Sequence, residues 1–312
     1  MDKNHFHLII IGSGPAGCTA AIYAARANLN FAMITGLEPG GQLIKTPTIA
    51  NWPGEPEEIA GALLMEKMMD QARNLGAAIL SDNIETVDLA KRPFSLKGNK
   101  AEYTCDALII ATGASAKFLG LPSEKKYIGK GVSTCAICDG FFYKNKEVVV
   151  VGGGNTTAEE ALYMAKIAKL VTIVHRRDTM RAEEGLVVQL QKTPNIKLEL
   201  NCNIVEILGD DRGVTGARIK NVNTNATQDI VCQAVFIAIG HKPNTEIFSK
   251  QLEMEHNYIK IGYGAATATS VSGVFAAGDV VAKNYHQAVV AAGLGCTATL
   301  DAKAFLAVLN LK

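Results

Sequence analysis

Short runs of apolar residues, each ending in a glycine-rich turn, are the dominant pattern along the chain. Leu8–Ile11 is one such run, and the glycine turn of residues 12–17 separates it from Thr19–Arg26, a segment of good helix formers. A short apolar run bounded by turn signals predicts a buried strand, and the segment after the turn predicts a helix. The same order returns at Val148–Val151, which a second glycine turn and a second helix-forming segment follow. The chain therefore contains two copies of a strand–turn–helix unit.

Two further strand-and-turn signals echo one another. Leu108–Gly113 ends the first unit and Val235–Gly240 ends the second, and each is typical of a buried strand followed by a tight turn. Val274–Asp279 gives one more such signal, before an Ala- and Gly-rich segment that predicts a long helix to the C-terminus. Because this last part has no glycine-turn unit of its own, the simplest arrangement inserts the second unit into the first.

The predicted fold class is α/β, with two Rossmann-like nucleotide-binding domains of three layers (β/β/α), the second inserted into the first. A length of 312 residues suits two domains at roughly 150 residues each. We expect residues 1–116 and 245–312 to form the outer domain, and residues 117–244 to form the inserted domain with the close cysteine pair.

Charge and hydropathy exclude several classes of partner. Lys plus Arg minus Asp plus Glu is 31 − 30 = +1, and no run of five like charges occurs, so nucleic acid is not expected to bind. The apolar segment Leu8–Ala25 is interrupted by Gly12, Gly14 and Gly17, which argues against a signal peptide. No other stretch approaches the run of about 18 apolar residues that spans a membrane, so no membrane contact is expected.

Five of the seven cysteines sit singly, mostly among apolar or small residues, and are expected to be reduced packing residues of a cytoplasmic protein. The other two, Cys135 and Cys138, are close together, with no second Cys or His pair at the spacing of a zinc finger. This spacing permits a readily reversible disulfide, so a redox role is expected rather than a bound metal. The single cysteines are Cys18, Cys105, Cys202, Cys232 and Cys296.

The first glycine turn has the G-x-G-x-x-G order of a dinucleotide site. Gly12 permits the tight turn, Gly14 lets the backbone approach a pyrophosphate, and Gly17 lets the helix pack closely on the strand. The free N–H groups and the positive dipole end of the following helix favour the phosphates.

The second copy differs in a way that indicates its ligand. Thr157 stands where Gly or Ala is usual, at some packing cost. The next strand ends in His175, Arg176 and Arg177, with Arg181 close behind, where an NAD site would place an acidic residue. Guanidinium groups suit the dianionic 2′-phosphate of NADP, so NADP(H) is predicted here.

The corresponding position of the first unit gives no plain signal for NAD. Thr35 and Gly36 follow the strand, Glu38 comes slightly later, and Gly40-Gly41-Gln42 provides a backbone with little side chain. Such a segment is suited to lie against a flat ring system, and a flavin is the natural candidate.

Together these motifs resemble the family of low-molecular-weight, bacterial-type thioredoxin reductases, from about residue 7 to 306. The most specific parts are the Cys pair with Asp139 and the His-Arg-Arg-Asp segment. The resemblance implies FAD on the first unit, NADPH on the second, a homodimer, and transfer of two electrons from NADPH to oxidised thioredoxin. By position it implies that Cys138 faces the flavin, that Cys135 attacks the partner's disulfide, and that Asp139 protonates the leaving thiolate.

The resemblance also extends to the cofactor sites, with one departure at His286, where enteric members of the family carry Arg. The residues implied for FAD are Gly12, Ser13, Gly14, Pro15, Ala16, Gly17, Thr35, Gly36, Glu38, Gly40, Gly41, Gln42, Asn51, Ala111, Thr112, Gly113, Gly278, Asp279, His286, Gln287 and Ala288. Those implied for NADPH are Gly152, Gly154, Asn155, Thr156, His175, Arg176, Arg177 and Arg181.

The nicotinamide and the Cys pair both need the same flavin ring, and both would belong to the inserted unit. We therefore expect this unit to rotate as a body about linkers near Gly113–Lys117 and Gly240–Asn244. Three alternatives remain: a flavin dithiol oxidase without a nicotinamide site, a ferredoxin or flavodoxin reductase that needs no Cys pair, and a nucleotide-sensing module with a cysteine clasp.

Overall fold

The computed structural model describes residues 4–281 and 285–311. Two compact units are present. The first is built from the chain up to Ser115 and from Lys242 onward, and the second is Ala116–His241. One α/β unit is thus inserted into another, which confirms the predicted fold class. Residues 1–3, 282–284 and 312, which the prediction placed in the outer domain, lie outside the described residues.

A parallel sheet forms the centre of the first unit. Its strands lie in the order β3-β2-β1-β6, with β19 also paired to β6, and all these pairs are parallel. Beyond β6 the antiparallel strands β5 and β4 extend the sheet. The strands are β1 (His5–Ile11), β2 (Phe31–Ile34), β3 (Ala78–Leu80), β4 (Ile84–Asp88), β5 (Phe94–Gly98), β6 (Glu102–Ile110) and β19 (Val274–Ala276).

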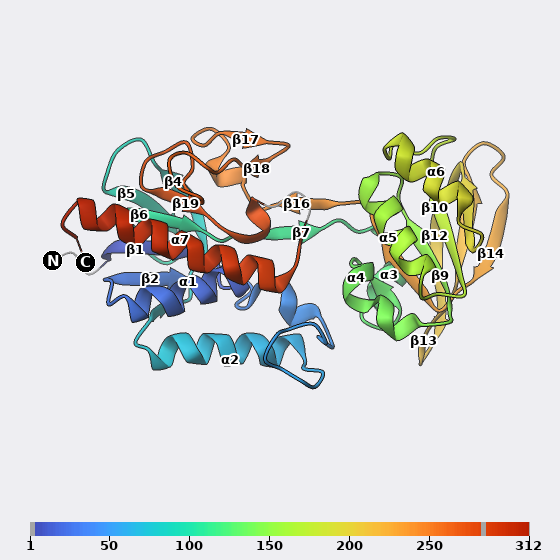
Figure 1. The fold of residues 1–312 in the computed structure, drawn as a ribbon, viewed down its shortest axis with the longest axis horizontal. Helices are drawn as coiled ribbons and strands as arrows, with labels where there is room; N and C mark the ends of the chain where they lie inside the picture. Colours follow the sequence, from blue (N-terminus) through green and yellow to red (C-terminus); the bar gives the residue numbers. More distant parts are fainter. Residues whose placement is uncertain (1–3, 282–284, 312) are drawn as a thin grey trace. The chain divides into compact units, whose positions relative to one another are not determined.

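Both faces of this sheet are covered. Successive residues of β1 point to opposite faces, so its side chains enter two different cores. Leu8 and Ile10 belong to a core shared with three helices, which Figure 1 shows together on one side of the sheet. Ile9 and Ile11 belong to a second core, shared with the hairpin strands β4 and β5. The helices are α1 (Pro15–Arg26), α2 (Gly61–Asn74) and α7 (Ala288–Val308).

The second unit repeats the three-layer arrangement. Its five-stranded parallel sheet has the order β11-β10-β9-β15-β8. Helices α5 and α6 share a core with one face, and the antiparallel sheet β12-β13-β14 shares a core with the other. The elements are β8 (Val132–Ser133), β9 (Glu147–Val151), α5 (Asn155–Ala165), β10 (Leu170–His175), α6 (Glu184–Lys192), β11 (Ile196–Leu200), β12 (Cys202–Asp210), β13 (Gly213–Asn221), β14 (Thr227–Val231) and β15 (Ala234–Ile237).

Short elements complete the chain. The two crossings between units are made at β7 (Ala114–Ala116) and β16 (His241–Pro243), which pair with each other. The remaining elements are η1 (Gly41–Lys45), α3 (Pro122–Tyr127), α4 (Ala136–Asp139), η2 (Gly140–Tyr143), η3 (Glu246–Phe248), β17 (Met254–Glu255), β18 (Tyr258–Ile259) and η4 (Gly278–Val280).

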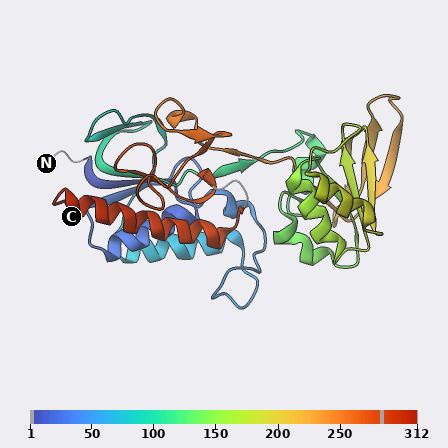
Figure 2. The same cartoon turned by 45° about the horizontal axis from the view of Figure 1, so that its top comes forward.

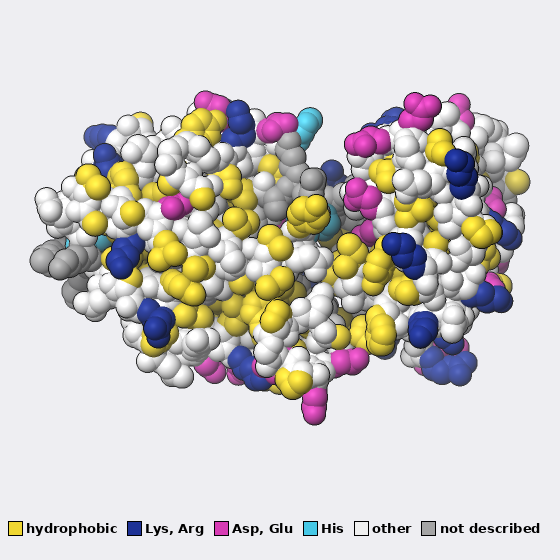
Figure 3. Space-filling model, in the orientation of Figure 1, with side chains coloured by type: hydrophobic (Ala, Val, Ile, Leu, Met, Phe, Trp, Pro, Cys, Tyr) yellow, Lys and Arg dark blue, Asp and Glu magenta, His cyan; other side chains and the backbone are white. Residues whose placement is uncertain are grey.

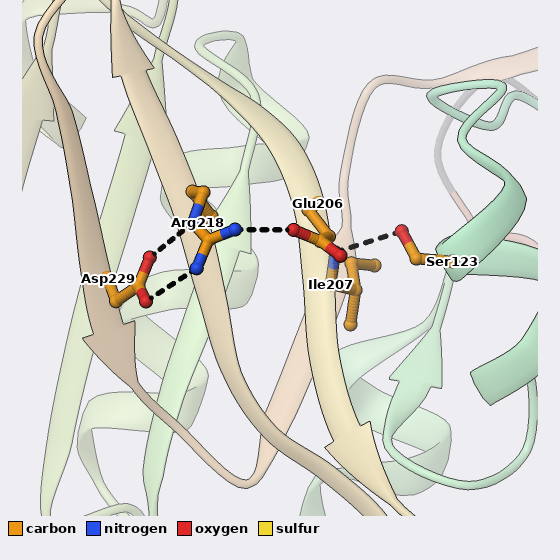
Figure 4. Close-up of polar contacts among 5 residues, drawn as sticks. All are labelled: Ser123, Glu206, Ile207, Arg218 and Asp229. Carbon is orange, nitrogen blue, oxygen red and sulfur yellow. Dashed lines mark hydrogen bonds and ion pairs between the residues drawn. The ribbon is translucent and has the colours of Figure 1, made fainter.

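One arginine joins all three strands of the antiparallel layer (Figure 4). Arg218 on β13 donates from Nε and Nη2 to the carboxylate of Asp229 on β14, at 2.7 and 3.0 Å, and from Nη1 to Glu206 on β12, at 2.7 Å. Next to Glu206, the backbone N–H of Ile207 donates to the hydroxyl of Ser123 in α3 at 2.9 Å. Because the charged groups are exposed, these pairs fix the strand register more than they add stability.

Helices α1 and α7 cross at a glycine. A Cβ built on Gly295 would lie 2.1 Å from the carbonyl oxygen of Ala16, so only glycine allows this approach. Nearby, the hydroxyl of Thr299 donates to the carbonyl of Ala20 at 3.1 Å. Figure 2 shows α7 lying along the helical side of the first unit.

Helix α7 also corrects one expectation from the sequence. Among the described residues it is the one helix that is long and apolar enough, by length and composition, to cross a membrane. The helix does not stand out in the sequence because Gly, Thr, Asp301 and Lys303 interrupt its apolar residues. The core helix of a folded domain passes the same test, so this is weak evidence for a membrane span.

The α1–α7 crossing leads to a stability prediction. Gly295→Ala forces the two helices apart and should lower the free energy of unfolding by about 1–3 kcal/mol. Gly293→Ala, on the same helix with no described atom within 4 Å of its Cβ position, is the matched control. The control should be neutral or stabilising by up to about 1 kcal/mol. Urea unfolding of both variants measures the difference, and equal effects would contradict the close crossing.

Candidate functional site

Four parallel strands of the first unit end at one edge of its sheet. They are β1, β2, β6 and β19, which end at Ile11, Ile34, Ile110 and Ala276. The carboxyl edge of such a sheet is where ligands of open α/β folds bind. The predicted segments that begin with Gly12, Thr35 and Ala111 follow their strands directly, and the segment that begins with Gly278 follows β19 after one residue, so the fold brings all four to one place.

The first glycine turn is as tight as its sequence predicts. Gly12 has a φ of +109°, and a Cβ there would lie 2.2 Å from the carbonyl oxygen of Ala111. A Cβ on Gly17 would lie 1.8 Å from the carbonyl oxygen of Gly12. At Gly14, by contrast, no described atom lies within 4 Å of the Cβ position. The turn is closed on its protein side and open at Gly14, where α1 begins, as a phosphate-binding turn requires.

Ser13 ties this turn to the loop after β2. Its hydroxyl donates to the carbonyl of Thr35 at 2.9 Å and accepts the backbone N–H of Gly40 at 3.0 Å. A Cβ on Gly41, which has a φ of +66°, would lie 3.2 Å from the Cα of Gly14. The Gly40–Gln42 backbone therefore lies directly against the glycine turn.

The last segment of the first unit completes the same edge. Gly278 has a φ of +80°, and a Cβ there would lie 2.9 Å from the Cβ of Ala16. Burial raises the pKa of the adjacent Asp279 to about 6. At the start of α7, the side-chain oxygen of Gln287 accepts from the amide of Asn51 at 3.5 Å. Burial also lowers the pKa of His286, which favours a neutral ring at neutral pH.

The side chain of Glu38 makes no polar contact with the described segments that meet at the carboxyl edge of the first unit. Its carboxylate is exposed and pairs with Lys45 at 2.7 Å. Only its backbone carbonyl takes part in the loop, since it accepts the N–H of Gly41 at 3.0 Å.

The second unit has an equivalent edge with a cleft of about 850 Å³. The glycine turn, His175, Arg176 and Arg181 line it, together with residues 238–240 after β15. The backbone N–H of Arg181 donates to the carbonyl of Gly153 at 2.6 Å, which joins the arginine loop to the glycine turn. Arg177 is not among the described residues that line the cleft.

His175 is held as a neutral ring beneath this loop. Its Nε2 lies 3.1 Å from the carbonyl of Thr179, and a Cβ on Gly153 would lie 2.2 Å from the ring. Burial lowers the pKa of His175, and the arginines nearby lower it further, against the hydrogen bond to Thr179. The positive charge of the loop therefore comes from guanidinium groups alone at neutral pH.

Thr157 is accommodated by a hydrogen bond. Its hydroxyl is fully buried and donates to the carbonyl of Ala238 at 3.0 Å. A Cβ on Gly152, which has a φ of +144°, would meet this hydroxyl at 2.3 Å and the Ala238 oxygen at 2.5 Å. The departure from the usual small residue is thus balanced by a bond that Gly or Ala could not make.

Cys135 and Cys138 form a disulfide, with their Cα atoms 5.3 Å apart. Cys135 precedes α4, and its sulfur accepts the backbone N–H of Cys138 at 3.2 Å. The other cysteines among the described residues are free, and burial raises the pKa of Cys18 and of Cys232 to about 12. The reactive sulfur chemistry of the chain is therefore concentrated in this pair.

Asp139 lies at the end of α4, directly after the pair. Burial raises the pKa of Asp139, and a hydrogen bond with Ser133 partly opposes this shift. Ser133 also accepts the backbone N–H of Cys135 at 3.1 Å. Around the pair the apolar side chains of Ile137, Phe141 and Phe142 are exposed.

Several residues that the sequence did not reveal contact predicted site residues or line the cleft. Glu183 binds Asn155 twice, accepting from its Nδ2 at 2.8 Å and donating its backbone N–H to Oδ1 at 2.9 Å. Phe118, Leu121 and Asn203 line the cleft from elements distant in sequence. No local motif could reveal them, because they reach the cleft through tertiary folding.

One group of potential metal ligands occurs among the described residues. Ligand atoms of His5, His7 and Asp106 lie within 4.8 Å of one another. His5 contacts Thr104 through Nδ1 at 2.9 Å and Asp106 through Nε2 at 3.3 Å. These contacts account for the ring orientation of His5 without an ion, and the group lies at the start of β1, away from the carboxyl edge.

Comparison with known proteins gives a consistent result. The family model described as pyridine nucleotide-disulphide oxidoreductase matches residues 6–295. A thioredoxin reductase from Coxiella burnetii is 56% identical, over 99% of each chain. A protein named glucosaminate ammonia-lyase from Pseudomonas fluorescens is 53% identical, over 98% of this chain and 97% of its own. The solved thioredoxin reductase from Giardia duodenalis is 42% identical, with a TM-score of 0.93, over 98% of this chain and all of that one.

The buried bond of Thr157 leads to a prediction. Thr157→Val keeps the shape but leaves the carbonyl of Ala238 without this donor, which should cost about 1–3 kcal/mol of unfolding free energy. Thr157→Ser keeps the hydroxyl and should cost less. Thr156→Val, at the exposed neighbouring position, is the control for the added methyl group. Urea unfolding measures all three, and equal loss in the Val and Ser variants would rule out the hydrogen bond as the cause.

Proposed function

The chain belongs to the pyridine nucleotide-disulphide oxidoreductase family, and on that premise we propose that it is a thioredoxin-disulfide reductase that uses FAD and NADPH. The observation that carries this function is the Cys135–Cys138 disulfide, next to one of two dinucleotide-type turns. The net reaction breaks the substrate's S–S bond. NADPH and one proton are consumed, and NADP⁺ and a dithiol are formed.

We assign the carboxyl edge of the first unit to FAD. The open side of Gly14 and the start of α1 fit its pyrophosphate, and the Gly40–Gln42 backbone fits a flat ring. When bound, FAD supplies the conversion of a hydride into an electron pair that a disulfide accepts. Asp279 is proposed to bind ligand hydroxyl groups, since a buried carboxyl needs a polar partner.

We assign the cleft of the second unit to NADPH. Arg176 and Arg181 line it and provide the guanidinium groups that a 2′-phosphate requires. The bond from the Arg181 N–H to the Gly153 carbonyl holds that loop beside the glycine turn. Arg177 is proposed to act on the phosphate through its charge, because it does not line the cleft.

The residues of α4 carry out the thiol chemistry in this proposal. Cys135 attacks the substrate disulfide and Cys138 then attacks the mixed disulfide, which restores the Cys135–Cys138 bond. Asp139 donates a proton to the departing thiolate, and its raised pKa helps it keep that proton near neutral pH. The exposed side chains of Ile137, Phe141 and Phe142 provide an apolar contact for thioredoxin.

We further propose that the protein works in the cytoplasm as a homodimer, without a membrane, and that the inserted unit rotates about its two linkers during turnover. Exposed apolar side chains lie along α7, in the area where yellow atoms gather in Figure 3. A second copy would bury this face. The exposed residues of α7 include Val289, Val290, Leu300 and Val308.

The redox pair separates this function from an ammonia-lyase activity. Elimination of ammonia from a sugar acid involves no net reduction and consumes no NADPH. Incubation with glucosaminate should therefore release no ammonia, whereas NADPH should be oxidised in the presence of oxidised thioredoxin. Release of ammonia without NADPH would overturn the proposal.

One prediction from the proposed function concerns the sulfur pair. Cys135→Ser should still bind FAD and should still bleach under nitrogen on addition of NADPH, but its reduction of thioredoxin should fall to background. Cys296→Ser, at a free cysteine on α7, is the matched control and should keep full activity. Stopped-flow absorbance of the flavin and a thioredoxin assay measure the two steps. A Cys135→Ser variant that still reduced thioredoxin would contradict the role of the pair, and one that reduced ferredoxin or flavodoxin would favour that class of reductase.

Another prediction from the proposed function concerns the nicotinamide cofactor. Arg176→Ala and Arg181→Ala should each raise the KM for NADPH by roughly 10- to 150-fold, because each removes a hydrogen bond to a charged group worth about 1.5–3 kcal/mol. The KM for NADH should hardly change. Arg212→Ala, at an exposed arginine that pairs with Asp210, should leave both values unchanged. Preference of the unmodified protein for NADH would contradict the assignment.

A further inference from the structure

Glu160 is a buried acid on the helix that packs against the segment of the redox pair. It lies on α5, which packs against α4, and the residue is only 8% exposed. The contact with α5 is also close where α4 ends, since a Cβ on Gly140 would lie 2.5 Å from the sulfur of Met164 on α5. The carboxyl of Glu160 accepts the backbone N–H of Ala136, the residue that follows Cys135. Glu160 is thus joined to the segment of residues 135–139, which carries both sulfurs.

The carboxyl is only half satisfied. Its Oε2 is buried and has no hydrogen-bond partner among the described residues. An unpaired buried carboxyl oxygen costs stability, and an apolar residue of similar size would avoid that cost. Fold stability therefore does not explain an acid at this position, and the redox pair on the adjoining segment offers another reason for it.

The surroundings of Glu160 favour its neutral form. Burial raises the pKa of Glu160 to about 7, the negative charge of Glu159 on the same helix adds to the shift, and the Ala136 N–H opposes it. On the adjoining elements the titratable groups are Asp139 in α4 and Tyr143 in η2, whose pKa values burial also raises. His175 at the end of β10 has a lowered pKa. Asp139, Tyr143 and His175 therefore offer Glu160 no positive charge at neutral pH. Helix α6, which also packs on α5, carries Glu184 and Lys192 at its two ends, and β9 begins with Glu147.

We propose that Glu160 is a positioning residue of the redox pair that gains a proton when the Cys135–Cys138 disulfide is reduced and releases it when the disulfide reforms. This inference rests on the proposed function, which supplies the two electrons from NADPH. Reduction breaks the S–S bond, and with one proton it gives one thiol and one thiolate. A second proton, taken from solvent by Glu160, offsets the new negative charge beside it.

The physical reason is the coupling between two nearby negative charges. A thiolate on the α4 side and a carboxylate joined to Ala136 would repel each other in a poorly solvated layer. Reduction therefore makes protonation of Glu160 more favourable. By linkage, a proton on Glu160 makes the reduced pair more favourable, so falling pH should assist reduction more strongly than the sulfur protons alone would.

The test measures protons taken up per reduction. The holoenzyme is equilibrated in glutathione redox buffers from pH 6 to 8, and the reduced fraction of the pair is trapped by alkylation and counted by mass. Across this range the pH dependence of the wild-type equilibrium should be steeper than that of Glu160→Gln by up to tenfold per pH unit, the effect of one proton. The Gln side chain keeps an acceptor for the Ala136 N–H but cannot titrate.

Glu184→Gln is the matched control, because it removes an exposed carboxylate from α6, the other helix packed on α5, without removing a charge that shifts the pKa of Glu160. It should keep the wild-type slope. Identical slopes in the wild type and Glu160→Gln would overturn the proposal. Thioredoxin reduction by NADPH is measured on the same samples, so a wild type that shows the steep slope but no such activity would refute the proposed function and leave the proton linkage intact.

Infrared difference spectroscopy of the wild-type holoenzyme gives a second measurement that needs no stable variant. Protein with ¹³C-labelled glutamate is compared before and after reduction of the pair at pH 7. A gain in the band of protonated glutamic acid supports the proposal, and an unchanged band overturns it.

Discussion

The structure depends on a close backbone contact that occurs once in each unit. A strand leaves its sheet through a glycine that presses against the carbonyl of the residue following the neighbouring strand, Gly12 against Ala111 and Gly152 against Ala238. Any side chain at either glycine would collide with backbone, which cannot move aside as a flexible side chain can. Because this contact fixes where each helix begins, it also fixes where the free N–H groups of that helix point.

The two copies use the same contact with different supporting residues. In the first copy the helix approaches through Gly17, which lies against Gly12 itself. In the second copy Thr157 fills the equivalent space and bonds to Ala238. The two units thus share the backbone path of this turn and differ in the side chains around it. The carboxyl edges of the two sheets also differ in their side chains. The edge of the second unit carries the arginines of the cleft, and the edge of the first unit carries the glycine-rich Gly40–Gln42 loop.

Local sequence was sufficient for the features that depend on neighbours along the chain. The strand–turn–helix units, the insertion of one unit into the other and the Cys135–Cys138 bond all follow from short patterns. Residues brought in by tertiary folding were not predictable, as Glu183 at Asn155 and Phe118 in the cleft show. Glu160 was missed for a related reason: its sequence neighbours are ordinary for a helix, and its significance comes from burial beneath α4.

The pairing of β7 with β16 has a consequence for the history of the chain. The backbone N–H of Lys117 also bonds to the carbonyl of Gly240 at 3.0 Å, so the inserted unit begins and ends at neighbouring points. Such a segment can be removed, or exchanged for another of unrelated size, without changing the path of the chain in the first unit. The Cys pair travels with that segment, so a single recombination event could give a flavin-binding ancestor both its electron donor site and its sulfur chemistry.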